Sequence, residues 1–568
     1  MLKSIQLELE NLFNAVGQKP VGEFSVPPKA EMGDIAYPCF AEAKAEGKKP
    51  NEIAVNLAEK LNPKINPGGL ISRAQAFGPY VNFFIDPAAV SKIILKEVDK
   101  KGERFGFDTQ KKQEKVMVEY SQPNTHKEFH VGHIRNVCIG SSVVNLLRLN
   151  GYKTTSANYV GDIGAHVAKC LWYIKKNNFQ PPETGRGRWL GTMYAEASAL
   201  IEEKPDLKSE VAVVQQKLES GDQELVSFWK ETKKWSMVGF EKIYKILGVE
   251  FDEWFFESEV EKPGKKIVQE LLKSGIAKIG EGGAIIVDLA SYGLDTFLIL
   301  KSDGTSLYAT KDLALAQLKF KKFSIDKSIT VIDNRQRQYF SQLFKTLELS
   351  GWKKEMVFLG YEFVTLPEGA MSSRKGNVVL FDNLYAEVKT KLFAETKARH
   401  EAWPVQQVEE TVCRLALAAI KFDMLKHPTD KAIVFDIKEA TAFEGFSGPY
   451  LLYVVARINS LLEKAKNQKI KPGSHYELLI SPEEKKLVLQ LGLAEETIQK
   501  ALAQYNPSVI ARYTFELAQS FNDFYNKQRI VDATPKDLAA ARLSLCLAVA
   551  QVLKNMLGVL AIETVEEM

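Results

Sequence analysis

A strand–turn–helix pattern at residues 116–147 constrains the fold of this chain more than any other feature. It begins with VMVEY (116–120), an apolar run typical of a buried strand, and the residues SQPN then turn the chain. From Val131 onward, apolar residues recur at helical spacing. KTTSANYVGDIG (153–164) follows as a second strand with its loop. This order of strand, helix and strand predicts a parallel sheet with crossover helices.

Three regions with different patterns divide the chain, which at 568 residues is too long for a single core. Residues 1–110 read as a small α+β unit. Residues 111–390 read as an α/β domain of the Rossmann type, in which a Pro-, Gly- and basic-rich stretch opens an insertion at about 185–280. Strand-like patterns then return in four stretches, AIIVDL, TFLILKSDG, SITVID and EMVFLGYEFV. Residues 391–568 show amphipathic helical patterns, which predict an all-α bundle.

The composition indicates an ordinary globular protein rather than a strongly basic or a membrane-spanning one. Hydrophobic residues make up 45%, charged residues 26%, and the net charge is +4. A local basic groove for an anionic partner remains compatible with this balance. No run of apolar residues approaches a membrane span, and the first residues do not resemble a signal peptide. Five scattered cysteines without a CxxC pair suit a reducing compartment. We therefore expect a cytoplasmic protein with no membrane partner.

NTHKEFHVGHIRN (124–136) holds three of the seven histidines, namely His126, His130 and His133. Their spacings of four and three could place them on one helix face as metal ligands. No HExxH signature or neighbouring cysteine completes such a site, so we predict no metal centre. A histidine cluster at a domain seam is the other structural alternative.

Phosphate binding fits this stretch better, because the start of a helix after a parallel strand offers free N–H groups and the positive end of the helix dipole. His130 and His133 can donate hydrogen bonds to phosphate oxygens. Gly132 lets a flat ring such as adenine approach the backbone. Lys127 adds a positive charge. The loop AMSSRKGNVV (370–379) could close over a triphosphate and neutralise the leaving pyrophosphate.

HVGH and MSSRKG resemble the HIGH and KMSKS signatures of class I aminoacyl-tRNA synthetases, although HxGH alone also occurs in other nucleotidyl transferases, such as small cytidylyltransferases. The ordered set of further stretches is similar to the arginyl-tRNA synthetases over nearly the whole chain. These stretches are VEYSQPNTHKEFHVGHIRN, ANYVGDIGAH, SDGTSLYATKDLALA, VIDNRQRQYF and GPYLLYVVARINSLL, with PPKAEMGDIAYP near the N-terminus and AARLSLCLAVAQVLKNMLGVLAIETVEEM at the C-terminus.

The resemblance implies an arginine–tRNA ligase that forms arginyl-adenylate from arginine and ATP, releases pyrophosphate, and transfers arginine to the terminal ribose of its tRNA. Mg²⁺ would accompany ATP, and no permanent metal or organic cofactor is expected. Members of this family commonly need bound tRNA before activation, so we expect that here. The expected partners are tRNA, arginine and ATP, without DNA, for a chain expected to act as a monomer.

The resemblance also assigns the residues of the active site. Catalytic roles fall on Lys127, His130, His133, Ser372, Arg374 and Lys375. ATP-binding roles fall on His130, Gly132, His133, Gly161, Asp162, Met371 and Ser372. Arginine-binding roles fall on Glu119, Asn124, Tyr308, Asp312 and Gln336. A guanidinium needs planar, charged acceptors, which suits two carboxylates, and Tyr308 and Asp312 share a helix face at a spacing of four.

Aromatic side chains that stack on unpaired bases are expected to bind the tRNA. Tyr450, Tyr453 and Arg457 lie on one helix face, where a core stripe with an arginine at its rim is the alternative. The resemblance places these three, with Tyr525 and Met568, at the anticodon loop. It places Tyr80, Asn82 and Phe83 near the D-loop.

Three positions depart from the family pattern. Ser373 stands where the second lysine of KMSKS is expected, and Lys127 is thought to compensate. His166 stands where glutamine is usual, and His126 matches no assigned position. A class I enzyme for cysteine, glutamate or lysine is the alternative activity. Scattered cysteines oppose the first and an acidic pocket opposes the second, whereas charge alone does not separate lysine from arginine. A non-catalytic RNA-binding relative is the other alternative, against which both signatures look intact.

Overall fold

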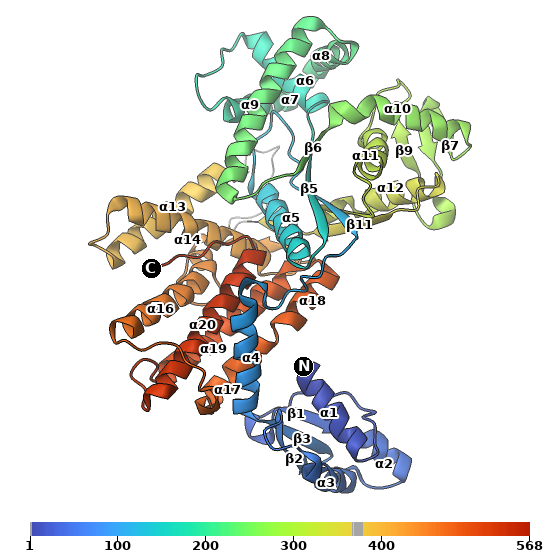
Figure 1. Cartoon of the computed structure of the whole chain (residues 1–568). Helices are drawn as coiled ribbons and strands as arrows, with labels where there is room; N and C mark the ends of the chain where they lie inside the picture. Colours follow the sequence, from blue (N-terminus) through green and yellow to red (C-terminus); the bar gives the residue numbers. More distant parts are fainter. Residues whose placement is uncertain (1–2, 366, 368–378) are drawn as a thin grey trace.

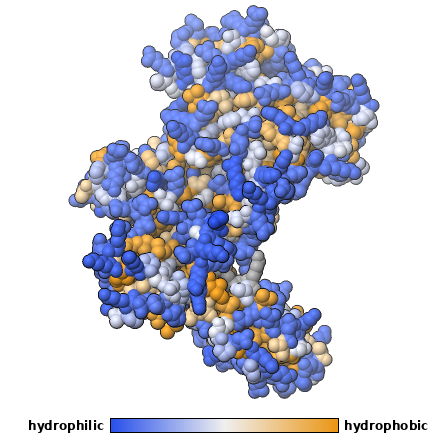
Figure 2. All heavy atoms as spheres, in the orientation of Figure 1, coloured by the Kyte–Doolittle hydropathy of each residue, from blue (hydrophilic) through white to orange (hydrophobic). Residues whose placement is uncertain are grey.

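The computed structural model describes residues 3–365, 367 and 379–568 and shows an elongated molecule. In Figure 1 the N-terminal domain lies at one end, the α/β domain with its insertion lies at the other, and the C-terminal helices lie between them. The visible surface in Figure 2 is mostly hydrophilic, with apolar side chains in small groups, as is usual for globular chains.

The N-terminal domain is a three-stranded antiparallel sheet covered by helices, in the strand order β1-β3-β2. Its elements are α1 (Lys3–Ala15), β1 (Ile35–Pro38), α2 (Phe40–Glu46), α3 (Pro50–Leu61), β2 (Ile71–Phe77) and β3 (Tyr80–Ile85). The rings of Phe13, Phe24, Tyr37 and Phe83 pack edge to face or tilted in its core. The next helix, α4 (Pro87–Lys101), packs against α17 and α20 of the C-terminal domain. The predicted boundary at residue 110 stays a prediction.

A five-stranded parallel sheet forms the centre of the α/β domain, in the order β11-β10-β4-β5-β6. Its strands are β4 (Lys115–Glu119), β5 (Lys153–Val160), β6 (Glu253–Phe256), β10 (Lys327–Asp333) and β11 (Glu355–Tyr361). The chain builds outward from β4 to β6 and then returns to the other side of β4. The strand order therefore reverses between β4 and β10, and such a switch point opens a crevice at the carboxyl ends of the strands. The predicted Rossmann-type sheet is confirmed.

Helices connect and cover these strands. The extent of the helical insertion and the strands formed by AIIVDL and TFLILKSDG differ from the sequence prediction. The helices are α5 (Val131–Leu149), α6 (Ala165–Asn177), α7 (Arg186–Glu203), α8 (Lys208–Ser220), α9 (Gln223–Leu247), α10 (Glu257–Lys273), α11 (Tyr308–Phe323) and α12 (Arg337–Leu349). The helical insertion consists of α6 to α9, because the short strand β6 returns to the parallel sheet within the predicted 185–280 range. AIIVDL and TFLILKSDG form strands of a separate antiparallel sheet made of β7 (Ala277–Ile279), β8 (Ile285–Val287) and β9 (Phe297–Leu300).

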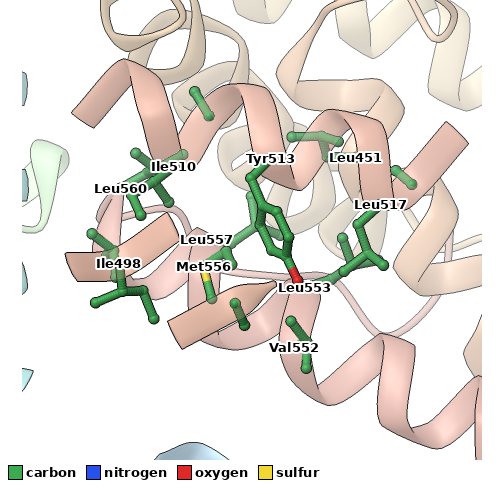
Figure 3. Packing of buried hydrophobic residues seen from close by; sticks show 14 of the residues in the cluster. Leu451, Ile498, Ile510, Tyr513, Leu517, Val552, Leu553, Met556, Leu557 and Leu560 are labelled. Carbon is green, nitrogen blue, oxygen red and sulfur yellow. The ribbon is translucent and has the colours of Figure 1, made fainter. Parts of the chain in front are cut away.

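The C-terminal region is helical, as predicted. Its helices are α13 (Phe381–Arg399), α14 (Val405–Leu425), α15 (Ile437–Ala440), α16 (Gly448–Asn467), α17 (Pro482–Gly492), α18 (Ala494–Gln504), α19 (Pro507–Lys527) and α20 (Lys536–Val559), and β12 (Val364–Thr365) pairs with β13 (Ile433–Val434). Ser481 and Glu484 form the capping box of α17. Among the described helices, α20 alone is apolar and long enough to span a membrane, but 72% of its apolar window is buried in this domain. Figure 3 shows its side chains Val552, Leu553, Met556 and Leu557 packed into the core.

Close packing of α5 on the sheet predicts that Gly140→Ala destabilises the protein. A Cβ at Gly140 would overlap the buried ring of Tyr120, which follows β4. Overpacking of this kind lowers the free energy of unfolding by about 1–3 kcal/mol. Urea unfolding of the purified variant measures it. Gly558→Ala in α20 is the matched control, because its added Cβ meets no atom within 4 Å. Equal unfolding free energies for the two variants would contradict the inferred close packing.

Candidate active site

A cavity of about 490 Å³ lies at the switch point between β4 and β10. Glu119 and Asn124 reach it from the end of β4, whereas Tyr308 and Asp312 reach it from the first turns of α11. Gln336 lies at its exposed rim, just before α12. The structure thus brings the five predicted arginine-binding residues to one cavity, although they come from three separate parts of the sequence.

Three carboxylates face this cavity, and two of them have lysine partners. Lys319 donates to Glu119 at 2.8 Å in a buried ion pair, and Lys311 donates to Glu257 at 2.5 Å. Burial raises the pKa of the Glu257 carboxyl, whereas the charge of Lys311 and its hydrogen bond oppose that shift. Sequence reasoning missed Glu257 and both lysines, because they lie in ordinary amphipathic helices whose spacing does not single them out.

Asp312 is the third carboxylate, and its surroundings differ from those of the other two. The Tyr339 hydroxyl donates to Asp312 Oδ2 at 2.5 Å, and among the described residues no cation forms an ion pair with Asp312. Burial raises the pKa of Asp312 to about 7; the Tyr339 hydrogen bond opposes that shift and the charge of Glu119 adds to it. A cation with several N–H donors would relieve the excess of negative charge at this position.

The loops that follow β4 and β5 form one unit at the mouth of the cavity. Asn124 pairs with Gly161 in a parallel bridge, and the Thr125 N–H donates to the Gly161 carbonyl at 2.9 Å. A Cβ on Gly161 would overlap Asn124 Oδ1, so a larger residue there would displace the Asn124 side chain. The β4 loop also has positive φ angles at Ser121 (75°) and Gln122 (49°), a strained conformation that its surroundings must maintain.

The first turn of α5 sets the protonation of the two histidines of HVGH. The Gly132 N–H donates to His130 Nδ1 at 3.2 Å, and the His130 N–H donates to His133 Nδ1 at 3.1 Å. Since both Nδ1 atoms accept, each neutral ring carries its hydrogen on Nε2. Burial lowers the pKa of His130 to about 4 and holds the pKa of His133 well below its ordinary value. The pair therefore offers two neutral N–H donors.

Lys127 and the chain before α13 lie close to this first turn. The Lys127 ammonium lies 5.1 Å from the centre of the Tyr194 ring in α7, and its charge also lowers the pKa of both HVGH histidines. The Val131 N–H donates to the Val379 carbonyl at 3.1 Å. The predicted loop residues Met371, Ser372, Arg374 and Lys375 lie outside the described residues.

His126 is a buried structural residue of the β4 loop in this fold. Its Nε2 bonds the Thr232 hydroxyl at 2.8 Å, its Nδ1 bonds the Thr125 hydroxyl at 2.9 Å, and its N–H donates to Ser236 Oγ at 3.0 Å. Burial lowers the pKa of His126 to about 3, so the ring is neutral. His126 thus connects the β4 loop to α9 of the insertion through hydrogen bonds.

The same helix also holds the β5 loop. The buried Asp162 carboxylate accepts from Lys233 at 2.7 Å and from the Ser258 hydroxyl at 2.6 Å, and the Trp229 indole donates to the Asp162 carbonyl at 2.6 Å. Asp162 does not line the cavity at the switch point, and its contact with ATP stays a prediction. His166 Nε2 bonds the Gly161 carbonyl at 3.2 Å, which makes His166 a support of the same loop.

The predicted anticodon-binding residues form one aromatic cluster in the C-terminal domain. The Arg457 guanidinium lies 4.6 Å from the ring centre of Tyr453 and 4.8 Å from that of Tyr525. Asn522 accepts from Arg457 at 2.8 Å and donates to the Tyr450 hydroxyl at 2.8 Å. A surface hollow of about 460 Å³ is lined by Tyr450, Tyr453, Arg457 and Asn522 of this cluster. Met568 packs, half-buried, against the core of this domain. Sequence reasoning missed Asn522.

The predicted D-loop contacts need correction for two residues of β3. Phe83 is fully buried in the N-terminal core, and Asn82 is 1% exposed, with its Nδ2 donating to the Met32 carbonyl at 2.9 Å. Neither side chain reaches the surface, and β3 is the central strand of this sheet. Tyr80, at the start of the strand, is half-exposed and packs against Phe40.

Among the described residues, no group of three or more histidine, cysteine, aspartate or glutamate side chains is placed to hold a metal ion. A parallel sheet with a switch point, neutral histidine donors at the first crossover helix and a helical bundle at the C-terminus together define a class I aminoacyl-tRNA synthetase. Family models agree: "tRNA synthetases class I (R), catalytic domain" matches residues 94–437, "Arginyl tRNA synthetase N terminal domain" matches 1–85, and "DALR anticodon binding domain" matches 451–568.

Individual relatives narrow the assignment. The chain is 38% identical to the arginine–tRNA ligase of Clostridium perfringens over 99% of this chain and 98% of the relative, and 40% identical to that of Bdellovibrio bacteriovorus over 95% and 93%. The arginyl-tRNA synthetase structure of Thermus thermophilus superposes with a TM-score of 0.81 at 26% identity, covering 99% of this chain and 100% of that chain. The chain belongs to the arginyl-tRNA synthetase family, which confirms the predicted class of enzyme, an arginine–tRNA ligase.

The α9 contacts predict that Thr232→Val weakens both the fold and the activity. Valine leaves the buried Nε2 of His126 without a partner, which lowers the free energy of unfolding by about 1–3 kcal/mol. A looser β4 loop should also slow arginyl-tRNA formation. Thr514→Val is the matched control, since the buried Thr514 hydroxyl bonds the Ile510 carbonyl in its own helix. Urea unfolding and aminoacylation rates measure both effects, and equal losses for the two variants would argue against the His126 contact.

Proposed function

We propose that the cavity at the switch point binds arginine and that the turn at the start of α5 binds ATP, so that the arginine carboxylate attacks the α-phosphate there. The observation that carries this proposal is the cluster of buried carboxylates in the cavity at the switch point, where Asn124 of the loop that leads to the HVGH turn also lies. Glu119 and Asp312 would receive the guanidinium, with Tyr308 beside them. Asn124 and Gln336 would bind the α-amino and carboxylate groups near the rim.

Positioning and charge stabilisation, without a protein nucleophile, would carry both steps. The Nε2–H groups of His130 and His133 would donate to phosphate oxygens, and the ammonium of Lys127 would offset their charge. A Cβ at Gly132 would come within 3.1 Å of the His130 ring, so glycine there serves the histidine pair as well as the approach of adenosine. ATP would enter as its Mg²⁺ complex, which makes the ion part of the substrate.

Several further assignments belong to this proposal. Met371 and Ser372 would bind ATP, and the charges of Arg374 and Lys375 would stabilise the leaving pyrophosphate. Gly161 would act by holding Asn124 close, and Asp162 by holding the β5 loop. Tyr450, Tyr453, Arg457, Tyr525 and Met568 would contact the anticodon loop, and Tyr80 would contact the D-loop. Bound tRNA would be needed for activation, and the enzyme would work as a cytoplasmic monomer.

Pyrophosphate exchange tests the proposed activity directly. The purified chain is assayed with arginine and with lysine, each with and without tRNA. Exchange with arginine only in the presence of tRNA is the expected result. Exchange with lysine but not arginine would reject the arginine site, and intact tRNA binding without any exchange would reject catalysis.

Asp312→Asn should raise the KM for arginine and leave the KM for ATP unchanged, because the neutral amide lacks the negative charge that pairs with the guanidinium. Loss of this charged interaction corresponds to an increase of about tenfold to a hundredfold. Aminoacylation kinetics at pH 8 measure both constants. Asp523→Asn, at an exposed carboxylate in α19, is the control. An unchanged arginine KM would place the guanidinium elsewhere.

Arginine affinity should depend on pH through Asp312. Burial raises the pKa of Asp312 to about 7, so the carboxyl is partly protonated at neutral pH. A guanidinium binds the ionised form, so binding releases a proton, and affinity falls as pH decreases through 7, by up to about tenfold per pH unit. Calorimetric titration with arginine at pH values from about 5.5 to about 8.5, on either side of the Asp312 pKa of about 7, measures how the affinity changes with pH. The slope should disappear in Asp312→Asn, and its persistence there would assign it to another group.

A further inference from the structure

The side chain of Tyr159 in β5 carries a hydroxyl group that the folded chain leaves without a partner. The hydroxyl oxygen is shielded from solvent, and among the described residues none forms a hydrogen bond with it. Burying a polar group in this way is unfavourable, so such a group requires an explanation. Tyr159 also lines the cavity at the switch point. A missing partner that enters this cavity would account for the unsatisfied hydroxyl.

The register of the sheet places Tyr159 beside the carboxylates. Ala157 of β5 aligns with Glu119 of β4, so both point to the same face of the sheet, and Tyr159 lies two residues further along that face. This is one step nearer to the carboxyl ends of the strands, where the substrate enters. The charges of Asp312, Glu257 and Glu119 add to the effect of burial and hold the pKa of Tyr159 well above its ordinary value, so the phenol stays protonated.

The existing hydrogen bonds indicate which ligand Tyr159 would serve. Both oxygens of Glu119 already accept, from Gln122 at 2.9 Å and from Lys319 at 2.8 Å. One oxygen of Asp312 accepts from Tyr339. A guanidinium brings five N–H donors in a planar fork, so it needs acceptors in several directions around it. A neutral phenol oxygen adds an acceptor without adding another negative charge to a crowded acidic cavity.

We propose that Tyr159 is a specificity-determining contact for the substrate guanidinium, whose N–H group donates to the phenol oxygen. This inference rests on the proposed arginine site. Ser328, the other shielded hydroxyl on the cavity wall, aligns with Met117 and lies further from the carboxyl ends of the strands. Tyr159 therefore adds to the binding of the side-chain end of the substrate, and not to ATP or tRNA.

Tyr159→Phe tests the proposal, since it removes one oxygen atom and keeps the ring. Arginine binding to the full-length protein is measured by calorimetry, together with the thermal stability of the unliganded protein. The dissociation constant for arginine should rise by about tenfold to a hundredfold, while the stability without ligand stays unchanged or increases. Butylguanidine, which lacks the amino-acid head group, should lose affinity by the same factor. The KM for ATP should not change.

Tyr513→Phe is the matched control, because the buried Tyr513 hydroxyl donates to the Gln490 carbonyl at 2.8 Å in the C-terminal core (Figure 3). It should lower thermal stability and leave arginine binding unchanged. An unchanged arginine dissociation constant in Tyr159→Phe, or a stability loss equal to that of Tyr513→Phe, would overturn the proposal. Failure of the wild-type protein to bind arginine would instead reject the proposed function itself.

Discussion

The pairing of β4 with β10 on one side and β5 on the other is the constraint on which the rest of this structure depends. Because the chain leaves β4 in one direction and returns on its other side, no crossover helix covers the gap between the carboxyl ends of β4 and β10. The crevice therefore follows from topology rather than from any one side chain. The position of Glu119, at the last residue of β4, makes this crevice acidic.

Helix α9 then holds the two loops that border the crevice. Five side chains on one side of this helix form hydrogen bonds with residues that follow β4 or that lie within or after β5. They are Trp229, Thr232, Lys233, Ser236 and Tyr244. The β4 loop has positive φ angles at the non-glycine residues Ser121, Gln122 and His126, a conformation that persists only where neighbouring contacts impose it. The insertion is therefore part of the active-site architecture, and changes in its position would be transmitted to the β4 loop through His126.

The electrostatic balance of the cavity explains why a cation fits there. Burying a carboxylate is unfavourable unless a partner compensates it, and Lys319 and Lys311 compensate Glu119 and Glu257. Asp312 has a phenol as its partner, and its pKa rises to about 7. Burial thus keeps this carboxyl partly protonated at neutral pH. A guanidinium supplies the missing charge and the donors together, whereas a strongly anionic ligand would meet repulsion.

The sequence by itself determined the parallel sheet and the helical C-terminus, because strand and helix periodicity are properties of neighbouring positions. The phosphate-binding role of the turn at HVGH and the five arginine-binding residues are proposals from the order of turn residues and from the family resemblance. The structure brings those five residues to one cavity. The sequence also indicated Tyr450, Tyr453 and Arg457 as one helix face. Only the tertiary structure decided the rest. His126 and Asp162 hold the loops after β4 and β5 through hydrogen bonds. Asn82 and Phe83 are buried in the N-terminal domain. Glu257 and Tyr159 line the cavity. These outcomes depend on which distant segments pack together, and burial and hydrogen-bond partners at such contacts have no signature in local spacing.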